Sequence, residues 1–72
     1  DRLELIEIEI AERAPAAGKS LDAVSFPQGA VIIAEQHTGA FPGPDMILEP
    51  GIQYILAVQP DVTDEVVRLL RG

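Results

Sequence analysis

A glycine, a lysine and a serine occupy positions 18 to 20, in the order that ends a phosphate-binding loop. That loop also needs a glycine five residues before the Gly-Lys-Ser step and a strand that leads into it. Position 13 is an arginine, so the spacing fails. We therefore interpret residues 18–20 as a loop in which Ser20 caps a short helix, and we predict no phosphate site.

Carboxylates and a single histidine are the other residues with evident chemistry. Glu7, Glu9 and Glu12 lie close together in the sequence, and the first two would be about 6.5 Å apart on one strand face. Calcium usually takes six or more oxygen ligands, so these glutamates are only weak metal candidates, and a solvated acidic face is the preferred interpretation. His37 has no companion Ser or Cys arrangement that marks a nucleophile, and we interpret it as a surface turn residue. We predict that the chain is not an enzyme; turnover that depends on His37 or Glu35 would contradict this.

A stiff loop is the remaining candidate. Pro42, Gly43 and Pro44 follow an apolar segment, and loops on rigid scaffolds often carry function. The loop either lines a ligand cleft or only turns the chain.

Hydrophobic periodicity predicts the elements that position these residues. Residues 4–10 alternate with period two, so Ile6, Ile8 and Ile10 share one strand face. Leu3 and Leu5 fall on the opposite face, which is therefore apolar at its start and available to a partner.

The other elements follow from apolar runs and from glycine and proline. Residues 30–36 fit a strand whose apolar run, residues 30–34, is buried on both faces; periodicity alone also allows a short buried helix there, and the β-branched Ile32 and Ile33 favour the strand. Residues 52–58 fit a central strand entered by a type II turn at residues 49–51. We also expect a short helix after Ser20, a weak return strand at residues 40–41, and a helix over residues 61–71 capped by Asp61. The order β-α-β-β-β-α, with a turn at residues 37–39 that is too short for a crossover, predicts a small α+β fold with a mostly antiparallel sheet and two helices.

Size and charge exclude several classes of protein. The chain has 72 residues, no cysteine, 47% apolar residues and a net charge of −7. Nucleic-acid binding needs clustered basic residues, and the charge also disfavours docking on an anionic membrane. No apolar run approaches the roughly 20 residues of a membrane helix. A domain this small buries only about 60% of its unfolded surface, so its core is expected to be shared with a second copy.

The ordered set of segments resembles the TrkA-C domain, also called RCK-C, which is the C-terminal subdomain of bacterial and archaeal potassium-transport regulators. The Gly-Lys-Ser-Leu step at residues 18–21 and the residues Pro44, Leu48 and Gly51 match the family pattern. The resemblance covers nearly all of the chain and is carried by the segments LELIEIEI, APAAGKSL, GAVIIAE, HTG, PDMILEPG, YILAV and PDVTDEVVRLL.

The resemblance implies one TrkA-C-like domain over residues 1–72, as a part of a longer transport protein. It implies a regulatory, ligand-sensing and dimerising role in the transport of a cation, chiefly potassium, at the cytoplasmic face of the membrane. The implied partners are a second copy and a transmembrane transport subunit or an attached nucleotide-binding domain, without nucleic acid and without direct membrane insertion. The alternative is a ligand-free assembly module of another membrane transporter or antiporter.

We expect no catalytic residue and no cofactor. Family members that bind a cyclic dinucleotide tend to have an asparagine at the start of the second strand, where Gly29 and Ala30 stand here. This difference argues against cyclic di-AMP and leaves an apolar cleft between two copies for a small regulatory ligand. The expected ligand-binding residues are Gly29, Ala30, Val31, Pro42 and Pro44, and the expected interface residues are Leu3, Leu5, Ile32 and Phe41.

Overall fold

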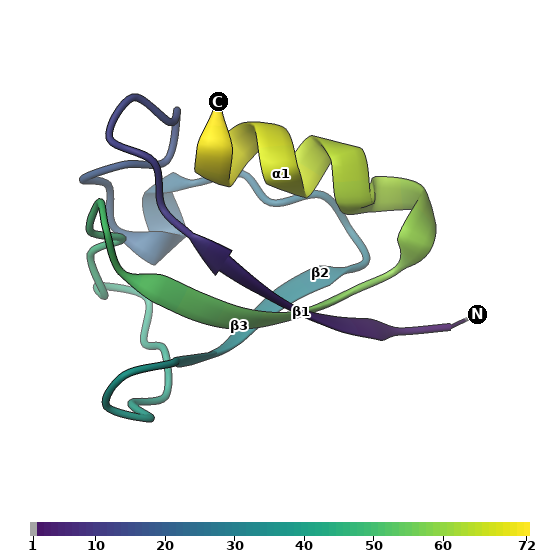
Figure 1. Ribbon diagram of the computed structural model, residues 1–72, viewed down its shortest axis with the longest axis horizontal. Coiled ribbons are helices and arrows are strands. Elements are labelled where there is room, and N and C mark those ends of the chain that lie inside the picture. The colour runs from purple at the N-terminus through teal and green to yellow at the C-terminus, as the bar shows by residue number, and fades with distance from the viewer. Residues whose placement is uncertain (1) are drawn as a thin grey trace.

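The structure is a computed structural model that describes residues 2–72, in which one α-helix packs across a three-stranded sheet (Figure 1). Two single turns of 3-10 helix, η1 and η2, lie in the connections. The elements in chain order are β1 (Glu4–Glu9), η1 (Leu21–Ala23), β2 (Ala30–Glu35), β3 (Gln53–Val58), η2 (Pro60–Val62) and α1 (Thr63–Arg71). The predicted α+β class and the antiparallel sheet are confirmed.

The central strand is β3. The sheet order is β1-β3-β2 and both pairings are antiparallel, as predicted for residues 52–58. The turn before β3 also has the expected form, because Gly51 has a φ of 85° and the Ile52 N–H donates to the Glu49 carbonyl at 3.2 Å. Glycine suits this position because other residues rarely adopt positive φ.

The hydrophobic core lies between the sheet and α1. Ile8, Ile32 and Leu56, one from each strand, are buried together with Val66 and Leu70 of the helix. The two helix residues are four apart and therefore lie on the same face. Burying an aliphatic side chain of this size stabilises a fold by about 1.5–3 kcal/mol, so this layer holds the sheet and the helix together.

The prediction of two helices is confirmed only for the second. The first is the single 3-10 turn η1, which ends after three residues because Val24 is extended, with φ −102° and ψ 127°. The N–H groups of Leu21 and Asp22, which have no partner within a helix, donate to the Met46 carbonyl at 2.8 Å and to the Pro44 carbonyl at 2.9 Å. The Ser20 hydroxyl donates to the Asp22 carboxylate rather than capping a helix. These bonds tie the loop after β1 to the loop after β2, and Ser20 and Ile47 form an isolated bridge between them.

Two further predictions are corrected. In residues 2–72 the sheet has three strands, and residues 40–41 are not a strand. The Glu35 N–H donates to the Ala40 carbonyl at 2.9 Å, but Pro42 and Pro44 prevent a continued ladder. The last helix begins at Thr63 rather than Asp61, because η2 precedes it and Asp61 makes no side-chain cap. Within the described residues, no helix has the length and apolar character needed to cross a membrane.

Candidate functional site

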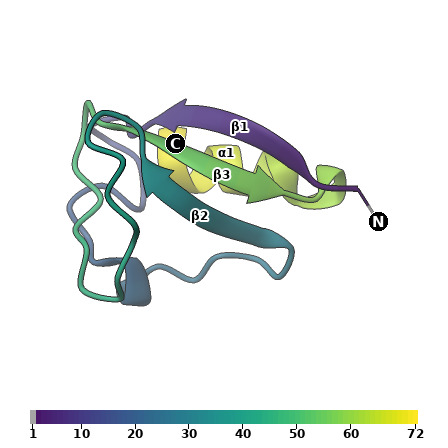
Figure 2. The same ribbon diagram turned by 90° about the horizontal axis from the view of Figure 1, so that it is seen from below.

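One side of the sheet has no layer packed on it. The helix α1 covers one side, and the view in Figure 2 shows β1, β3 and β2 uncovered on the other. We call this second side the open face. Because side chains alternate along a strand, the open face carries the residues of β1 and β3 that do not point toward α1.

The open face is apolar at one end and polar at the other. Leu5, Ala57 and Val31 are register partners that form a row across all three strands. Leu5 is 71% exposed and Val31 is 57% exposed. Farther along β1, Glu7 pairs with Ile55 and Glu9 pairs with Gln53, which places two carboxylates on the same side.

Two more apolar residues near this row are exposed. Leu3, just before β1, is 66% exposed, and Ile33 is partly exposed at a register shift in β2 between Ile32 and Ala34. Residues 30–34 were expected to be buried on both faces, but β2 is an edge strand with only its helix side covered. Large exposed apolar patches on small proteins usually mark a site of interaction.

The four expected interface residues do not form one surface in the structure. Leu3 and Leu5 are exposed at the apolar end, as the alternation predicts. Ile32 lies in the core against Leu56, so its side chain is unavailable to a partner. Phe41 lies in the loop after β2 rather than on the sheet, and at 83% exposure it is more exposed than any other large apolar side chain of residues 2–72.

The expected ligand-binding residues do not come together within one copy. Gly29, Ala30 and Val31 lie at the start of β2, whereas Pro42 and Pro44 lie in the loop beyond its other end (Figure 2). The two groups are thus separated by the length of a six-residue strand, or about 20 Å.

The weak metal candidates also lie apart. Glu7 and Glu9 are exposed on the open face, and Glu12 is exposed in the loop after β1. In residues 2–72, no group of three or more His, Asp or Glu side chains is placed to hold a metal ion. His37 is exposed in the turn after β2, where its backbone N–H donates to the Glu35 carboxylate.

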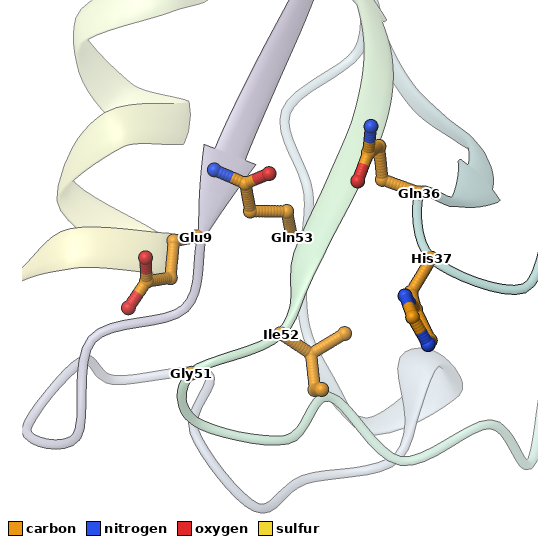
Figure 3. A pocket seen from close by; sticks show the side chains of 6 residues that line it. All are labelled: Glu9, Gln36, His37, Gly51, Ile52 and Gln53. Carbon is orange, nitrogen blue, oxygen red and sulfur yellow. The ribbon is translucent and has the colours of Figure 1, made fainter.

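A shallow polar depression of about 400 Å³ lies at one end of the sheet (Figure 3). Glu9 and His37 lie on opposite sides of it, with the carboxamides of Gln53 and Gln36 between them, and the Glu9 carboxylate points away from the other three side chains. Its remaining lining residues are Gly51 and Ile52. These groups can offer weak hydrogen bonds, but they do not converge on a common point.

A smaller depression lies between β2, β3 and the loop that joins them. It has a volume of about 230 Å³, and we call it the Glu35–Glu49 depression. Its apolar lining consists of Ala40, Met46, Ile47, Ile52 and Tyr54, and its two charged lining residues are Glu35 and Glu49. No local pattern in the sequence predicts this depression, because its lining residues come from separate segments.

Hydrogen bonds fix both sides of the Glu35–Glu49 depression. The buried Tyr54 hydroxyl donates to the Ile47 carbonyl and accepts from the Glu49 N–H, both at 3.3 Å. Burial raises the pKa of Tyr54; the Glu49 N–H opposes this, and the charges of Glu49 and Glu35 add to it.

The Glu35 carboxylate is held by the following turn. It accepts hydrogen bonds from the Thr38 hydroxyl at 2.8 Å and from the backbone N–H groups of His37 and Thr38. Desolvation raises the pKa of Glu35, but these hydrogen bonds, with the charge of His37, bring the pKa below its ordinary value. Glu35 is therefore ionised at neutral pH in a fixed position.

The fold defines a small α+β module with one side of its sheet left open. The model of the TrkA-C domain family matches residues 5–71, so the chain belongs to the TrkA-C domain family. The resemblance inferred from the ordered segments is confirmed, and family membership indicates a regulatory domain of ion transport proteins. A comparison with curated proteins gives no match.

Proposed function

We propose that this domain regulates a cation transport protein, chiefly for potassium, by pairing with a second copy through the open face. The observation that carries the proposal is the row formed by Leu5, Ala57 and Val31, in which Leu5 and Val31 are exposed on either side of the buried Ala57. A 72-residue chain gains stability by covering such a row. Family membership supplies the transport context.

The charge distribution on the open face favours one orientation of the two copies. If equivalent ends of the two sheets met, Glu7 and Glu9 of one copy would face the same residues of the other. Like charges placed opposite one another are destabilising. An antiparallel arrangement, with the twofold axis perpendicular to the strands and centred near Leu5, avoids this and covers the apolar row.

The same orientation brings together residues 29–31 of the two copies, because Val31 lies in the row on which the axis is centred. Pro42 and Pro44, beyond the other end of β2, lie away from this contact. A cleft between the copies would then be lined by residues 29–31 of both. A small ligand that favours one pairing geometry would shift the population between geometries.

The change in pairing would pass to the attached parts of the protein. We propose that these are a nucleotide-binding domain or a transmembrane transport subunit at the cytoplasmic face of the membrane. The free energy that a ligand can pass to these parts cannot exceed the difference between its binding free energies for the two pairing geometries.

A second candidate is a ligand-free assembly module of another membrane transporter or antiporter. Two observations favour it. The expected ligand-binding residues are separated within one copy, and Gly29 and Ala30 stand where a cyclic-dinucleotide binder tends to have asparagine. The module would still pair through the open face.

Sedimentation velocity of the 72-residue chain over a range of concentrations tests both candidates. Runs with cyclic di-AMP, with calcium and with potassium are compared with runs in sodium buffer. A dimer whose dissociation constant changes with one of these supports sensing, whereas a dimer indifferent to all of them supports assembly alone. A chain that stays monomeric at high concentration in every buffer contradicts both.

A further inference from the structure

We propose that the Glu35–Glu49 depression receives a lysine or arginine side chain from a basic, partly apolar segment of the transport protein. This proposal rests on the proposed function, because the transport context identifies the segment. The second copy is not the expected occupant, since the depression lies beside the β2–β3 loop and is formed without any residue of the apolar row.

The size of the depression suits one side chain. Pockets that hold small-molecule ligands usually measure about 300–1,000 Å³, whereas this depression measures about 230 Å³. Lysine and arginine lay their apolar stems along apolar surface and keep the charged head at a polar edge. Met46, Ile47 and Ile52 supply that surface, and Glu35 and Glu49 supply the edge.

The charge of the depression is of one sign. None of the five basic residues of the chain lines it, and the chain as a whole carries a net charge of −7. Cytoplasmic segments next to membrane helices carry an excess of lysine and arginine. The positive charge of such a segment is complementary to the two carboxylates, and the apolar part of its lysine or arginine side chains is complementary to the apolar lining.

Exposed apolar side chains at the same loop provide further contacts. Phe41 directly follows Ala40, which lines the depression, and Phe41 is 83% exposed. Ile47, a lining residue, is 45% exposed. Aromatic residues often carry much of the energy of an interface, so Phe41 is the expected anchor for the apolar part of the segment.

The depression is formed before binding. The Tyr54 hydroxyl bridges the Ile47 carbonyl and the Glu49 N–H, and the turn after β2 fixes Glu35. A preorganised site loses less freedom on binding, which favours a short peptide as ligand.

The test uses a capped amphipathic peptide of lysine and leucine, free of aromatic residues, and the same peptide with glutamate in place of lysine. The chain has one tyrosine and no tryptophan, so the fluorescence of Tyr54 reports on the depression itself. We expect the lysine peptide to change this fluorescence saturably and the glutamate peptide to have no effect. Loss of an exposed charge pair in Glu49→Gln should raise Kd about two- to fivefold. Loss of the aromatic anchor in Phe41→Ala should raise it about tenfold.

Controls separate the depression from bulk charge and from pairing. Glu12→Gln removes one exposed charge away from the depression, and Leu5→Thr alters the open face; neither should change the peptide Kd. Equal Kd values for Glu49→Gln and Glu12→Gln would show attraction by net charge alone and overturn the proposal, as would the absence of binding. Sedimentation of Phe41→Ala completes the set: an unchanged dimer constant supports the assignment of Phe41 to the peptide, and a weakened dimer overturns it. Pairing that fails while the peptide still binds refutes only the proposed function.

Discussion

Replacement of Leu5 by threonine should separate pairing from folding. Leu5 is 71% exposed in one copy, so its loss leaves the core intact. Threonine is β-branched and keeps the preference for a strand, while its hydroxyl removes much of the apolar surface. We expect the variant to fold normally and to pair weakly.

The expected weakening follows from the exposed fraction. Complete burial of a leucine side chain is worth about 1.5–3 kcal/mol, so covering the exposed 71% of Leu5 is worth about 1–2 kcal/mol. The residue occurs once in each copy, which doubles the effect to about 2–4 kcal/mol per dimer. Since 1.4 kcal/mol is a factor of ten, the dissociation constant should rise by about thirtyfold or more.

Sedimentation equilibrium at several concentrations measures this constant, and urea unfolding of dilute samples measures folding. Val67→Thr is the matched control, because Val67 is an exposed valine on α1, away from the open face. It makes a change of the same kind, and valine and threonine have similar helix propensities. Its dimer constant should equal that of the unchanged chain.

Equal dimer constants for Leu5→Thr and the unchanged chain would refute the assignment of the interface to the open face. If the variant unfolded in dilute solution, the premise that Leu5 does not stabilise the single copy would be refuted. If Val67→Thr weakened the dimer instead, the result would place the interface on α1.

Three other changes test local features. Gly29→Ala should destabilise the fold by about 1–2 kcal/mol in urea unfolding, because Gly29 has a φ of 103°; Gly43→Ala, at a glycine outside the positive-φ set, should be nearly neutral. Thr38→Val should raise the pKa of Glu35 toward its ordinary value of about 4.3 in an NMR titration. Because the folded pKa of Glu35 is lowered, its contribution is present above that ordinary value and is lost as pH falls through the folded pKa; a titration unchanged by Thr38→Val would contradict this account. Ultraviolet titration should show Tyr54 ionising above its ordinary value of about 10. Its contribution to stability is complete below that value and is lost as pH rises through the folded pKa, so an ordinary titration would contradict the burial argument.

The strands were predictable because the hydrophobic pattern of a strand depends mainly on which side of the sheet is covered. Alternation in residues 4–10 predicted both the buried isoleucines and the exposed Leu5. The apolar run in residues 52–58 predicted a central strand. The run in residues 30–34 was ambiguous, since an apolar residue on an open face looks the same in sequence as one in a core. The exposure of Val31 is therefore a property of the tertiary structure.

The first helix and the Glu35–Glu49 depression were not predictable for a different reason. The N–H groups of Leu21 and Asp22 bond to carbonyls of Met46 and Pro44, far away in the sequence. Local propensity favoured a helix at Leu21, but these long-range bonds fix the course of the loop, and the extended Val24 ends the turn after three residues. The depression depends on the same folded loop, so neither feature has a local signal.

The unequal coverage of the sheet leads to a prediction about stability as well as pairing. A 72-residue domain is expected to have a free energy of unfolding of about 4–11 kcal/mol. A partner present at a hundred times its dissociation constant adds about 2.7 kcal/mol by mass action. The urea midpoint of the unchanged chain should therefore rise by roughly 1–3 M between dilute and concentrated samples, given the usual dependence of about 1–3 kcal/mol per molar urea for small proteins. The midpoint of Leu5→Thr should rise by only about a third as much over the same range, because the same concentration is only about three times its larger dissociation constant. A midpoint independent of concentration in both proteins would mean that the apolar row remains exposed to water and that pairing through it contributes nothing to the fold.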